Sequence, residues 1–239
     1  MVEPTLEAEN ATITVEGAPK AQAPASGRIA CCSDVQPAPV RYAFAKRTID
    51  IIGALIFLLL FAPVFVVIAL LVALTSPGPI FYKSTRVGLC GKPFAFIKFR
   101  SMRVDADKIL AQLQAQNEKD GPIFKIKNDP RITPVGRFLR KYSLDELPQF
   151  LSVLTGEMSL VGPRPPLVHE VEQYDAKTKE RLRVKPGITC YWQIMGRSNL
   201  SFEEWMDLDR KYIEEMSFWK DITIMVKTPA AVFRGDGAY

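Results

Sequence analysis

The sequence predicts a mostly α-helical protein with a few short strands, in which a re-entrant, membrane-embedded helix precedes a compact α/β domain. Residues 51–74 form a run without a charged residue that is long enough to enter a membrane. The rest of the chain alternates short helical patterns, brief extended stretches and turns rich in Pro or Gly. We therefore expect a tail over residues 1–40, a membrane-embedded segment over 41–79 and a cytoplasmic domain over 80–239.

The first forty residues contain several prolines and lack hydrophobic periodicity, which predicts a disordered tail. They also lack the basic start and apolar core of a secretory signal peptide.

Pro63 interrupts the middle of the uncharged run from Ile51 to Leu74. As a straight helix the run would be about 36 Å long, but a proline inside a helix removes a hydrogen bond and favours a kink. Basic residues flank the run on both sides, which predicts that both ends face the cytoplasm. The run would then enter the membrane, turn near Ala62 and Pro63, and leave on the same face. A single kinked helix that spans the membrane is an equally good interpretation of the hydropathy alone.

The domain beyond residue 79 begins after Thr75-Ser76-Pro77-Gly78-Pro79, a run that is incompatible with a helix. Residues 94–99 are expected to form a short strand. Helices are expected over 105–117, 134–141 and 144–154, and Gly156 is expected to end the last of them. Pro148 is tolerable only near the start of that helix, which puts Asp145 and Glu146 in its first turn.

Ser201 and Glu204 form a helix-start pattern, and large apolar residues recur after it at near-helical spacing. These residues are Phe202, Trp205, Leu208, Tyr212 and Met216. Such side chains usually form a core, but on a membrane-attached chain Trp205, Trp219 and Phe233 would also suit the level of the lipid headgroups. Amphipathicity alone does not separate these two interpretations.

Composition limits the chemistry that the chain can perform. A formal net charge of +5 on 239 residues indicates an anionic partner, and nucleic acid, anionic lipid and a phosphorylated small molecule all fit. His169 is the only histidine, which argues against a zinc site or a Ser-His catalytic pair. The four cysteines lack metal-ligand spacing and are expected to be reduced. A magnesium ion held by oxygen atoms is the metal that this composition favours.

The segment from Ser143 to Pro166 contains the residues that are best suited to phosphate chemistry. Asp145 and Glu146 are adjacent, and Arg164 follows between two prolines. One carboxylate can attack phosphorus, a second can hold a divalent cation, and arginine binds phosphate through a planar set of donors. The structural alternative is a capping box, in which Ser143 and Glu146 cap the helix start and Asp145 is only a favourable first-turn charge.

The order of several motifs resembles that of a known family. A basic-flanked apolar run with a central proline precedes Ser-Leu-Asp-Glu-Leu, Val-Gly-Pro-Arg-Pro, Lys-Pro-Gly-Ile-Thr and Gly-Arg-Ser-Asn. This order, over residues 46–239, is similar to that of the bacterial sugar transferases, which are monotopic polyprenyl-phosphate hexose-1-phosphate transferases. The ending Gly237-Ala238-Tyr239 and the segment around Cys190 look most like members that start exopolysaccharide or capsule repeat units.

The resemblance implies roles for particular residues of this chain. Asp145 matches the nucleophile that attacks the sugar-linked phosphorus, Glu146 matches the carboxylate that holds magnesium, and Arg164 matches a phosphate-binding arginine. Further charges match positions in the family's active site without an equally defined role: Lys98, Arg140, Arg197 and Asp209.

Two positions depart from the family's pattern. Ala62 stands where the family often has serine before the proline, so the membrane break would rest on Pro63 alone. Lys185 stands where arginine is frequent, so a bidentate contact there would be lost.

The resemblance implies an enzyme that transfers hexose-1-phosphate from a UDP-sugar to undecaprenyl phosphate through a covalent aspartyl-phosphosugar intermediate, with Mg²⁺ as cofactor. It also implies amphipathic interfacial helices, contact with membrane lipid, the cytoplasmic face of the bacterial inner membrane and no nucleic-acid partner. The oligomeric state, including a homo-oligomer, stays open. The alternative is a non-catalytic, membrane-anchored scaffold of a polysaccharide assembly complex, which gives no reason for the acids and the arginine to occur together.

Overall fold

The computed structural model describes residues 40–235 and 237. The tail expected over residues 1–40 therefore lies, apart from its last residue, outside the described part. The α-helices are α1 (Val40–Thr75), α2 (Ala106–Leu113), α3 (Pro134–Lys141), α4 (Gln149–Thr155), α5 (Val168–Glu172), α6 (Ala176–Lys179), α7 (Tyr191–Met195), α8 (Phe202–Glu215) and α9 (Phe218–Arg234). The strands are β1 (Phe81–Val87), β2 (Pro93–Phe99), β3 (Ser159–Val161) and β4 (Gly187–Thr189). The 3-10 helices are η2 (Leu89–Gly91), η3 (Gln114–Gln116), η4 (Leu144–Glu146), η5 (Glu180–Arg183) and η6 (Arg197–Asn199).

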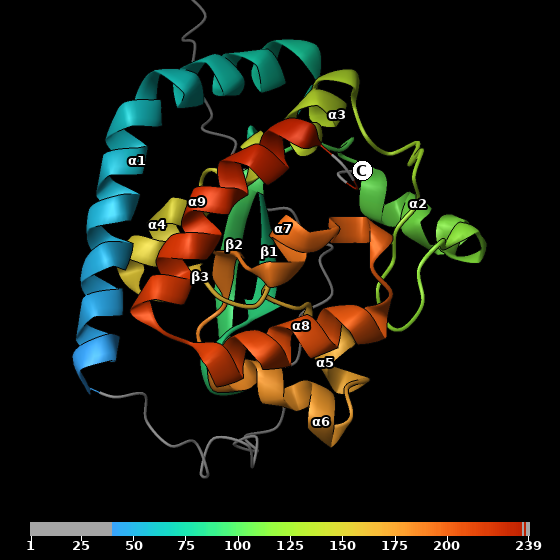
Figure 1. Cartoon of the computed structure of the whole chain (residues 1–239). Helices are drawn as coiled ribbons and strands as arrows, with labels where there is room; N and C mark the ends of the chain where they lie inside the picture. Colours follow the sequence, from blue (N-terminus) through green and yellow to red (C-terminus); the bar gives the residue numbers. More distant parts are fainter. Residues whose placement is uncertain (1–39, 236, 238–239) are drawn as a thin grey trace, which may run out of the picture.

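These elements confirm the expected mostly helical fold with a few short strands. The strands lie near the centre, and helices surround them (Figure 1). β1 and β2 form an antiparallel hairpin in which Phe81 pairs with Phe99. β3 and β4 form a separate parallel pair in which Ser159 is opposite Gly187.

The helix α1 continues through Pro63 as a single helix of 36 residues. Its first part runs along one side of the domain, and its last part crosses over the top of the domain (Figure 1). A proline ring inside a helix removes a backbone hydrogen bond and commonly produces such a change of direction. The two helices expected on either side of a break at Pro63 are therefore one bent helix.

The first part of α1 is joined to the domain by polar contacts. Arg47 donates a hydrogen bond of 2.6 Å to the carbonyl oxygen of Val153, near the end of α4. Asp50 is buried and accepts hydrogen bonds of 2.9 Å from the Ser159 hydroxyl and the Leu160 amide, in β3. A buried carboxylate needs such partners, because it has lost its contact with water.

Lys46 joins α1 to two further elements. Its ammonium lies 2.8 Å from a carboxylate oxygen of Asp221, in α9, and donates to the Val161 carbonyl oxygen at 3.0 Å. The Tyr212 hydroxyl donates to the other oxygen of Asp221 at 2.8 Å. The network therefore holds α1, α8, α9 and the end of β3 together.

The last part of α1 packs on the same domain through apolar side chains. Phe57 stacks on Phe150 of α4 with ring centres 3.8 Å apart, and Phe65 meets Phe99 of β2 edge-on. Further along the helix, buried side chains enter a core cluster that comprises Ile68, Val72, Phe99, Leu139 and Leu147. Both parts of the bent helix therefore rest on one domain.

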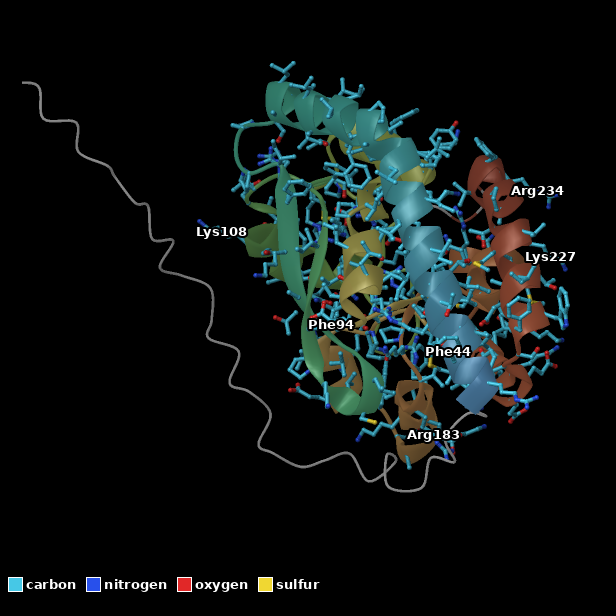
Figure 2. All side chains as sticks on the ribbon, turned by 90° about the vertical axis from the view of Figure 1, so that its left-hand side faces the viewer. Phe44, Phe94, Lys108, Arg183, Lys227 and Arg234 are labelled. Atoms are coloured by element: carbon cyan, nitrogen blue, oxygen red, sulfur yellow. The ribbon has the colours of Figure 1, made fainter. Side chains whose placement is uncertain are left out.

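The outward face of α1 consists of exposed apolar side chains. Phe44 and Leu59 are each 76% exposed, and Leu74 is 83% exposed. Among the described residues, α1 is the helix that is long and apolar enough to cross a membrane. Figure 2 looks onto this side of the molecule, where Phe44 marks the start of α1 and α9 lies beside it.

Most of the predicted elements of the domain are confirmed. The expected strand over 94–99 is β2, and α3 has the expected bounds of 134–141. The helix expected over 144–154 is divided into η4 and α4, which are separated by Leu147 and Pro148. Gly156 ends α4 in the left-handed conformation with φ 89°, and its amide donates to the carbonyl oxygens of Ser152 and Val153.

The aromatic residues of the C-terminal region divide between core and surface. Tyr212 is 1% exposed and belongs to the main core cluster, which agrees with the core interpretation. Trp219 and Phe233 of α9 are 75% and 76% exposed. The expected capping box of Ser201 and Glu204 is confirmed at the start of α8.

One cysteine expectation is wrong. Cys90 is disulfide-bonded, whereas we expected all the cysteines to be reduced. Cys190 is a free, buried cysteine.

Candidate active site

Asp145 and Glu146 lie in η4, the short turn between α3 and α4. Ser143, just before this turn, adopts the left-handed conformation with φ 54°, which is strained for a residue with a side chain. Its side chain caps no backbone amide, and the Glu146 amide bonds only the Ser143 backbone carbonyl. The capping box that we considered as the structural alternative is therefore not formed, and another reason for the two acids is needed.

Asp145 is 5% exposed and lies beside two basic side chains. Burial raises the pKa of the Asp145 carboxyl above its ordinary value, and the neighbouring Glu146 raises it further. The positive charges of Lys98, in β2, and Arg140, in α3, lower the pKa and so favour the ionised form. β2 and α3 both contact η4, so three elements bring these side chains together.

Lys98 shares this environment. Burial lowers the pKa of the Lys98 ammonium to about 8, and the nearby Arg140 and Arg86 lower it in the same direction. The negative charge of Asp145 raises it. Lys98 and Asp145 are therefore mutual electrostatic partners, which supports the expectation that they belong to one site.

Glu146 is half-buried and lines a small cleft together with Arg164. The Arg164 guanidinium stands 5.8 Å from the centre of the Trp192 ring, which forms another part of the wall. Gln149, 2% exposed, also lines the cleft, and its side-chain amide nitrogen has no hydrogen-bond partner within residues 40–235. The complete lining is Phe96, Glu146, Gln149, Arg164, Pro165, Gly187, Ile188 and Trp192.

The loop that presents Arg164 is fixed through its backbone carbonyl groups. Because its prolines have no N–H group, the loop cannot form a ladder of its own. Instead, four successive carbonyl oxygens each accept a hydrogen bond of 2.9 to 3.1 Å from another segment. The accepting residues and their donors are Pro163 with Gly187, Arg164 with Arg181, Pro165 with Arg86, and Pro166 with Val87.

The parallel pairing of β3 and β4 fixes the point at which this loop begins. A Cβ atom at Gly187 would lie 2.0 Å from the Gly162 amide nitrogen, and one at Gly162 would lie 2.4 Å from the Lys185 carbonyl oxygen. Both contacts are far shorter than packing permits. Glycine at both positions therefore allows the two backbones to approach and sets the direction in which the Arg164 loop leaves β3.

Lys125, in the segment between η3 and α3, completes a cluster of positive charge. Burial lowers the pKa of its ammonium to about 7, and the charges of Arg164, Arg140, Lys119 and Arg197 lower it further. Arg197, which the sequence also indicated, is 5% exposed. Lys125 and the four basic residues that act on it therefore come from four separate segments of the chain.

Asp209 is connected to this cluster through Arg181. It is 1% exposed, and its carboxylate is 2.7 Å from the guanidinium of Arg181. Arg181 in turn donates to the Arg164 carbonyl oxygen at 3.0 Å. The structure thus connects Asp209 to the site through Arg181. Lys98 and Arg140 instead act directly on the charge of Asp145, and Arg164 lines the cleft. Pro63 lies in α1, at the bend.

Sequence reasoning missed several residues of the site. Arg86, Lys125 and Arg181 belong to no phosphate-binding motif and lie far along the chain from Asp145. Gln149 lies three residues after Glu146, at the start of α4, and this spacing was the one signal available in the sequence. Buried Arg86 donates to Pro165, so its role is to hold the Arg164 loop and add positive charge.

Carboxylate oxygens are the ligands that this site could offer to a magnesium ion. Among the described residues, no group of three or more His, Cys, Asp and Glu side chains is arranged to hold a metal ion. Magnesium is commonly held by one or two carboxylates together with phosphate oxygens of a substrate, and Glu146 faces the cleft beside Arg164. The residues present therefore fit an ion that is held jointly with a phosphorylated ligand.

Comparisons with known proteins identify several sequence relatives of this chain. The exopolysaccharide production protein ExoY of Rhizobium meliloti is 42% identical over 199 residues, which cover 82% of this chain and 88% of ExoY. Galactosyl transferase CpsE of Streptococcus agalactiae is 49% identical over 195 residues, and the UDP-glucose:undecaprenyl-phosphate glucose-1-phosphate transferase of Escherichia coli is 45% identical over 203 residues. Each of these two alignments covers 81% of this chain, but only 43% and 41% of the longer relatives.

The chain therefore spans less than half the length of several curated relatives that it matches. The family model for bacterial sugar transferases matches residues 41–235, which include α1, both acids and the whole cationic cluster. The chain belongs to the bacterial sugar transferase family.

Proposed function

We propose that this protein transfers hexose-1-phosphate from a UDP-sugar to undecaprenyl phosphate and so starts the assembly of an exopolysaccharide or capsule. The observation that carries the proposal is the buried Asp145, which lies beside Glu146 and close to the basic residues Lys98 and Arg140. The printed names of relatives that act on undecaprenyl phosphate support the same reaction class. A non-catalytic scaffold would gain nothing from a buried acid next to several cations.

In the proposed first half-reaction, an ionised oxygen of Asp145 attacks the phosphorus that is bonded to the sugar. A bond forms between this oxygen and phosphorus, while the bond between phosphorus and the bridging oxygen breaks. The electron pair leaves with the nucleoside monophosphate, and the sugar phosphate remains on Asp145 as an acyl phosphate.

In the second half-reaction, a phosphate oxygen of undecaprenyl phosphate attacks the same phosphorus and the Asp145 carboxylate is released. The aqueous donor and the lipid acceptor then need not be bound at the same time. Lys98 and Arg140 would favour the ionised form of Asp145 in both steps, and Arg164 would bind phosphate oxygens.

Magnesium is proposed as the cofactor, with Glu146 as its protein ligand. A magnesium ion there would neutralise part of the charge on the donor phosphates. Without such neutralisation, the Asp145 carboxylate and the pyrophosphate would repel each other at close range.

The proposed location is the cytoplasmic face of the bacterial inner membrane, with α1 inserted as a re-entrant helix. This topology is supported by the packing of both parts of α1 on one domain, because a straight spanning helix would carry its ends to opposite faces. Basic residues flank α1 on both sides, which favours the cytoplasm for both ends. Trp219 and Phe233 of α9 would then reach the lipid headgroups.

The covalent step is tested by incubating the purified protein with the UDP-sugar alone and locating the added hexose phosphate by peptide mass spectrometry. We expect the modification on Asp145. Asp145→Asn preserves size but removes the charged nucleophile, so both the adduct and net transfer to lipid should disappear. Glu157→Gln, which changes an exposed acid just after α4, is the matched control and should react normally. An adduct on another residue, or normal transfer by Asp145→Asn, would exclude the mechanism.

A further inference from the structure

The short helix α3 is fixed in place by its contacts with the domain. Leu139 is fully buried and belongs to the core cluster that α3 shares with the last part of α1. A Cβ atom at Gly136 would collide with the Ser101 carbonyl oxygen, so glycine allows α3 to approach that segment closely. The Thr133 hydroxyl accepts from the Gly136 amide at 2.9 Å and caps the start of the helix. The remaining face of α3 therefore has a fixed orientation.

This remaining face combines positive charge with an aromatic pair. Arg137 and Lys141 are both exposed, and their spacing of four residues puts them next to each other on the helix. Phe138 is 54% exposed, and its ring meets the Tyr142 ring edge-on with ring centres 5.1 Å apart. The Lys141 ammonium lies 5.4 Å from the centre of the Tyr142 ring. Below, the α3 surface means Arg137, Phe138, Lys141 and Tyr142.

Helix stability alone does not account for the α3 surface. A cation in the last turn of a helix is favourable, which suits Lys141, but Arg137 is the fourth of eight residues and gains nothing from the helix dipole. Two cations four residues apart also repel each other. The sequence of α3, Pro-Val-Gly-Arg-Phe-Leu-Arg-Lys, contains no acidic residue. The α3 surface thus suits an anion, and its aromatic pair suits an apolar group attached to that anion.

The α3 surface lies next to both helices that we propose to contact lipid. α3 contacts α1, whose last part ends in the exposed Leu74. On another side, a Cβ atom at Gly235, directly after α9, would lie 3.2 Å from the Lys141 Cε atom. Phe233, two residues earlier in α9, is exposed. Figure 1 accordingly shows α3 beside the end of α1 and the end of α9.

The same helix leads directly into the active site. α3 contacts η4, which carries Asp145, and Lys141 precedes Asp145 by four residues. Arg140, the neighbour of Lys141, is half-buried and lies close to the Asp145 carboxyl. α3 therefore connects the lipid-facing side of the molecule with the acid that we propose carries the sugar phosphate.

We propose that the α3 surface is the docking site of the lipid acceptor, where Arg137 and Lys141 bind its phosphate group and Phe138 contacts the first part of its apolar chain. The inference rests on the proposed function and deepens it, because it assigns residues to the second substrate. The acceptor joins an anionic headgroup to a long apolar chain, and the α3 surface offers a contact for each. A UDP-sugar has no apolar chain for Phe138 to contact.

Bulk anionic phospholipid also has a negative headgroup on apolar chains. The place of the α3 surface in the chain favours the acceptor, because η4 and Asp145 follow directly after it. A phospholipid bound at this point would occupy the approach from the membrane to Asp145 without being able to react. The test below is therefore designed to tell these two occupants apart.

The first test measures the two half-reactions separately, with the full chain in phosphatidylcholine nanodiscs that contain undecaprenyl phosphate as the one anionic lipid. Changing Arg137→Gln and Lys141→Gln together should raise the KM for undecaprenyl phosphate about ten- to thirtyfold, for two cations lost at a membrane surface. The kcat at saturating acceptor should change by less than about twofold, because the lost contacts serve binding. Formation of the adduct from the UDP-sugar alone should keep its wild-type rate, which also shows that the variant is folded.

Lys108→Gln combined with Lys127→Gln is the matched control. This pair removes the same charge from two exposed lysines outside the α3 surface, and its KM for the acceptor should equal that of wild type. An equal rise of KM in the control would mean that net charge alone attracts the acceptor, which overturns the proposal. An unchanged KM in the α3 variant would assign the surface to bulk anionic lipid, and a slowed adduct step would assign it to the donor. Either result overturns the proposal as well.

Phe138 tests the contact with the apolar chain. Phe138→Gln should raise the KM for undecaprenyl phosphate about fivefold, because a half-exposed aromatic side chain loses its apolar contact. Phe138→Leu keeps an apolar side chain and should retain most of the acceptor affinity. Equal KM values in these two variants overturn the role of Phe138.

Failure of this inference is distinguishable from failure of the proposed function. If wild type transfers sugar phosphate to undecaprenyl phosphate and the Arg137→Gln, Lys141→Gln variant does so with the same KM, only the docking site is wrong. If wild type transfers none, the proposed function itself is wrong.

Discussion

Arg181 donates a hydrogen bond of 3.0 Å to the carbonyl oxygen of Arg164 and at the same time pairs with the buried Asp209 carboxylate at 2.7 Å. A cation that is buried in this way is fixed in position, because moving it would separate it from its counter-charge. Arg164 itself is half-buried and faces the cleft. The position of Arg164, which we propose binds phosphate, thus depends on the ion pair between Arg181 and Asp209.

Arg181→Gln should disturb donor binding without removing any group that contacts the donor. We expect the KM for the UDP-sugar to rise about tenfold or more, since a buried charge-assisted hydrogen bond contributes about 1.5–3 kcal/mol. Steady-state kinetics at saturating acceptor measure the change. Arg183→Gln is the control, because the Arg183 ion pair with Glu180 is 3.9 Å long and partly exposed. An unchanged KM in Arg181→Gln contradicts this dependence.

Asp209 should make the stability of the fold depend on pH. Burial raises the pKa of the Asp209 carboxyl to about 6, from an ordinary value of 3.8. A folded-state pKa above the unfolded value means that this group stabilises the fold below about pH 4, and that the contribution is lost as the pH rises through about 6. The contribution corresponds to about 3 kcal/mol.

Asp209→Asn removes the titrating group, so its stability relative to wild type should increase by up to about 3 kcal/mol between pH 4 and pH 7.5. Urea denaturation at the two pH values gives the difference in the free energy of unfolding. Asp207→Asn changes a side chain that is 58% exposed, and its stability difference from wild type should stay constant. A constant difference for Asp209→Asn as well would show that the Arg181 charge fully offsets burial.

Removal of magnesium should abolish transfer. We expect no turnover in excess chelator and full recovery when magnesium is added back, because without the cation the carboxylates of Asp145 and Glu146 repel the pyrophosphate. Glu146→Gln should raise the magnesium concentration needed for half-maximal rate, while the modified residue in the trapped adduct stays the same. Turnover assays across a magnesium series measure both effects. Normal rates in excess chelator would remove magnesium from the mechanism.

The two ends of α1 should lie on the same side of the membrane. Single cysteines introduced at positions 41 and 83 should react with a membrane-impermeant reagent only after the cytoplasmic side is opened. Pro63→Ala restores a backbone hydrogen bond and should favour a straighter helix, so it should lower the fraction of molecules that label in this way. Labelling of the two positions from opposite sides in wild type would establish a spanning helix instead.

The sequence was sufficient to predict local elements but not the tertiary contacts of the site. The strand over 94–99, the helix over 134–141 and the end of α4 at Gly156 follow from short-range rules on proline, glycine and hydrophobic spacing. Ser143 shows the limit of those rules. Its sequence context matches a capping box, yet packing of η4 against α3 and β2 places Ser143 in the left-handed region.

The resemblance to a family indicated the acids and Arg164, but it did not indicate which further basic residues lie near them. Lys125 belongs to none of the motifs that the sequence contains, so its approach to Arg164 and Arg197 depends wholly on tertiary structure. Asp209 was expected among the active-site charges, and the structure connects it to the site through Arg181. Periodicity and motif spacing carry no information on such indirect contacts.

The polar bonds between the first part of α1 and the domain have a consequence for how the two substrates meet. Lys46, Arg47 and Asp50 bind α9, α4 and β3, so α1 cannot tilt or slide without the domain. In the proposed arrangement, the distance between Asp145 and the bilayer surface is therefore set by the fold itself. The active site would then stay at one fixed distance from the bilayer, and the phosphate group of the lipid acceptor would have to move to Asp145.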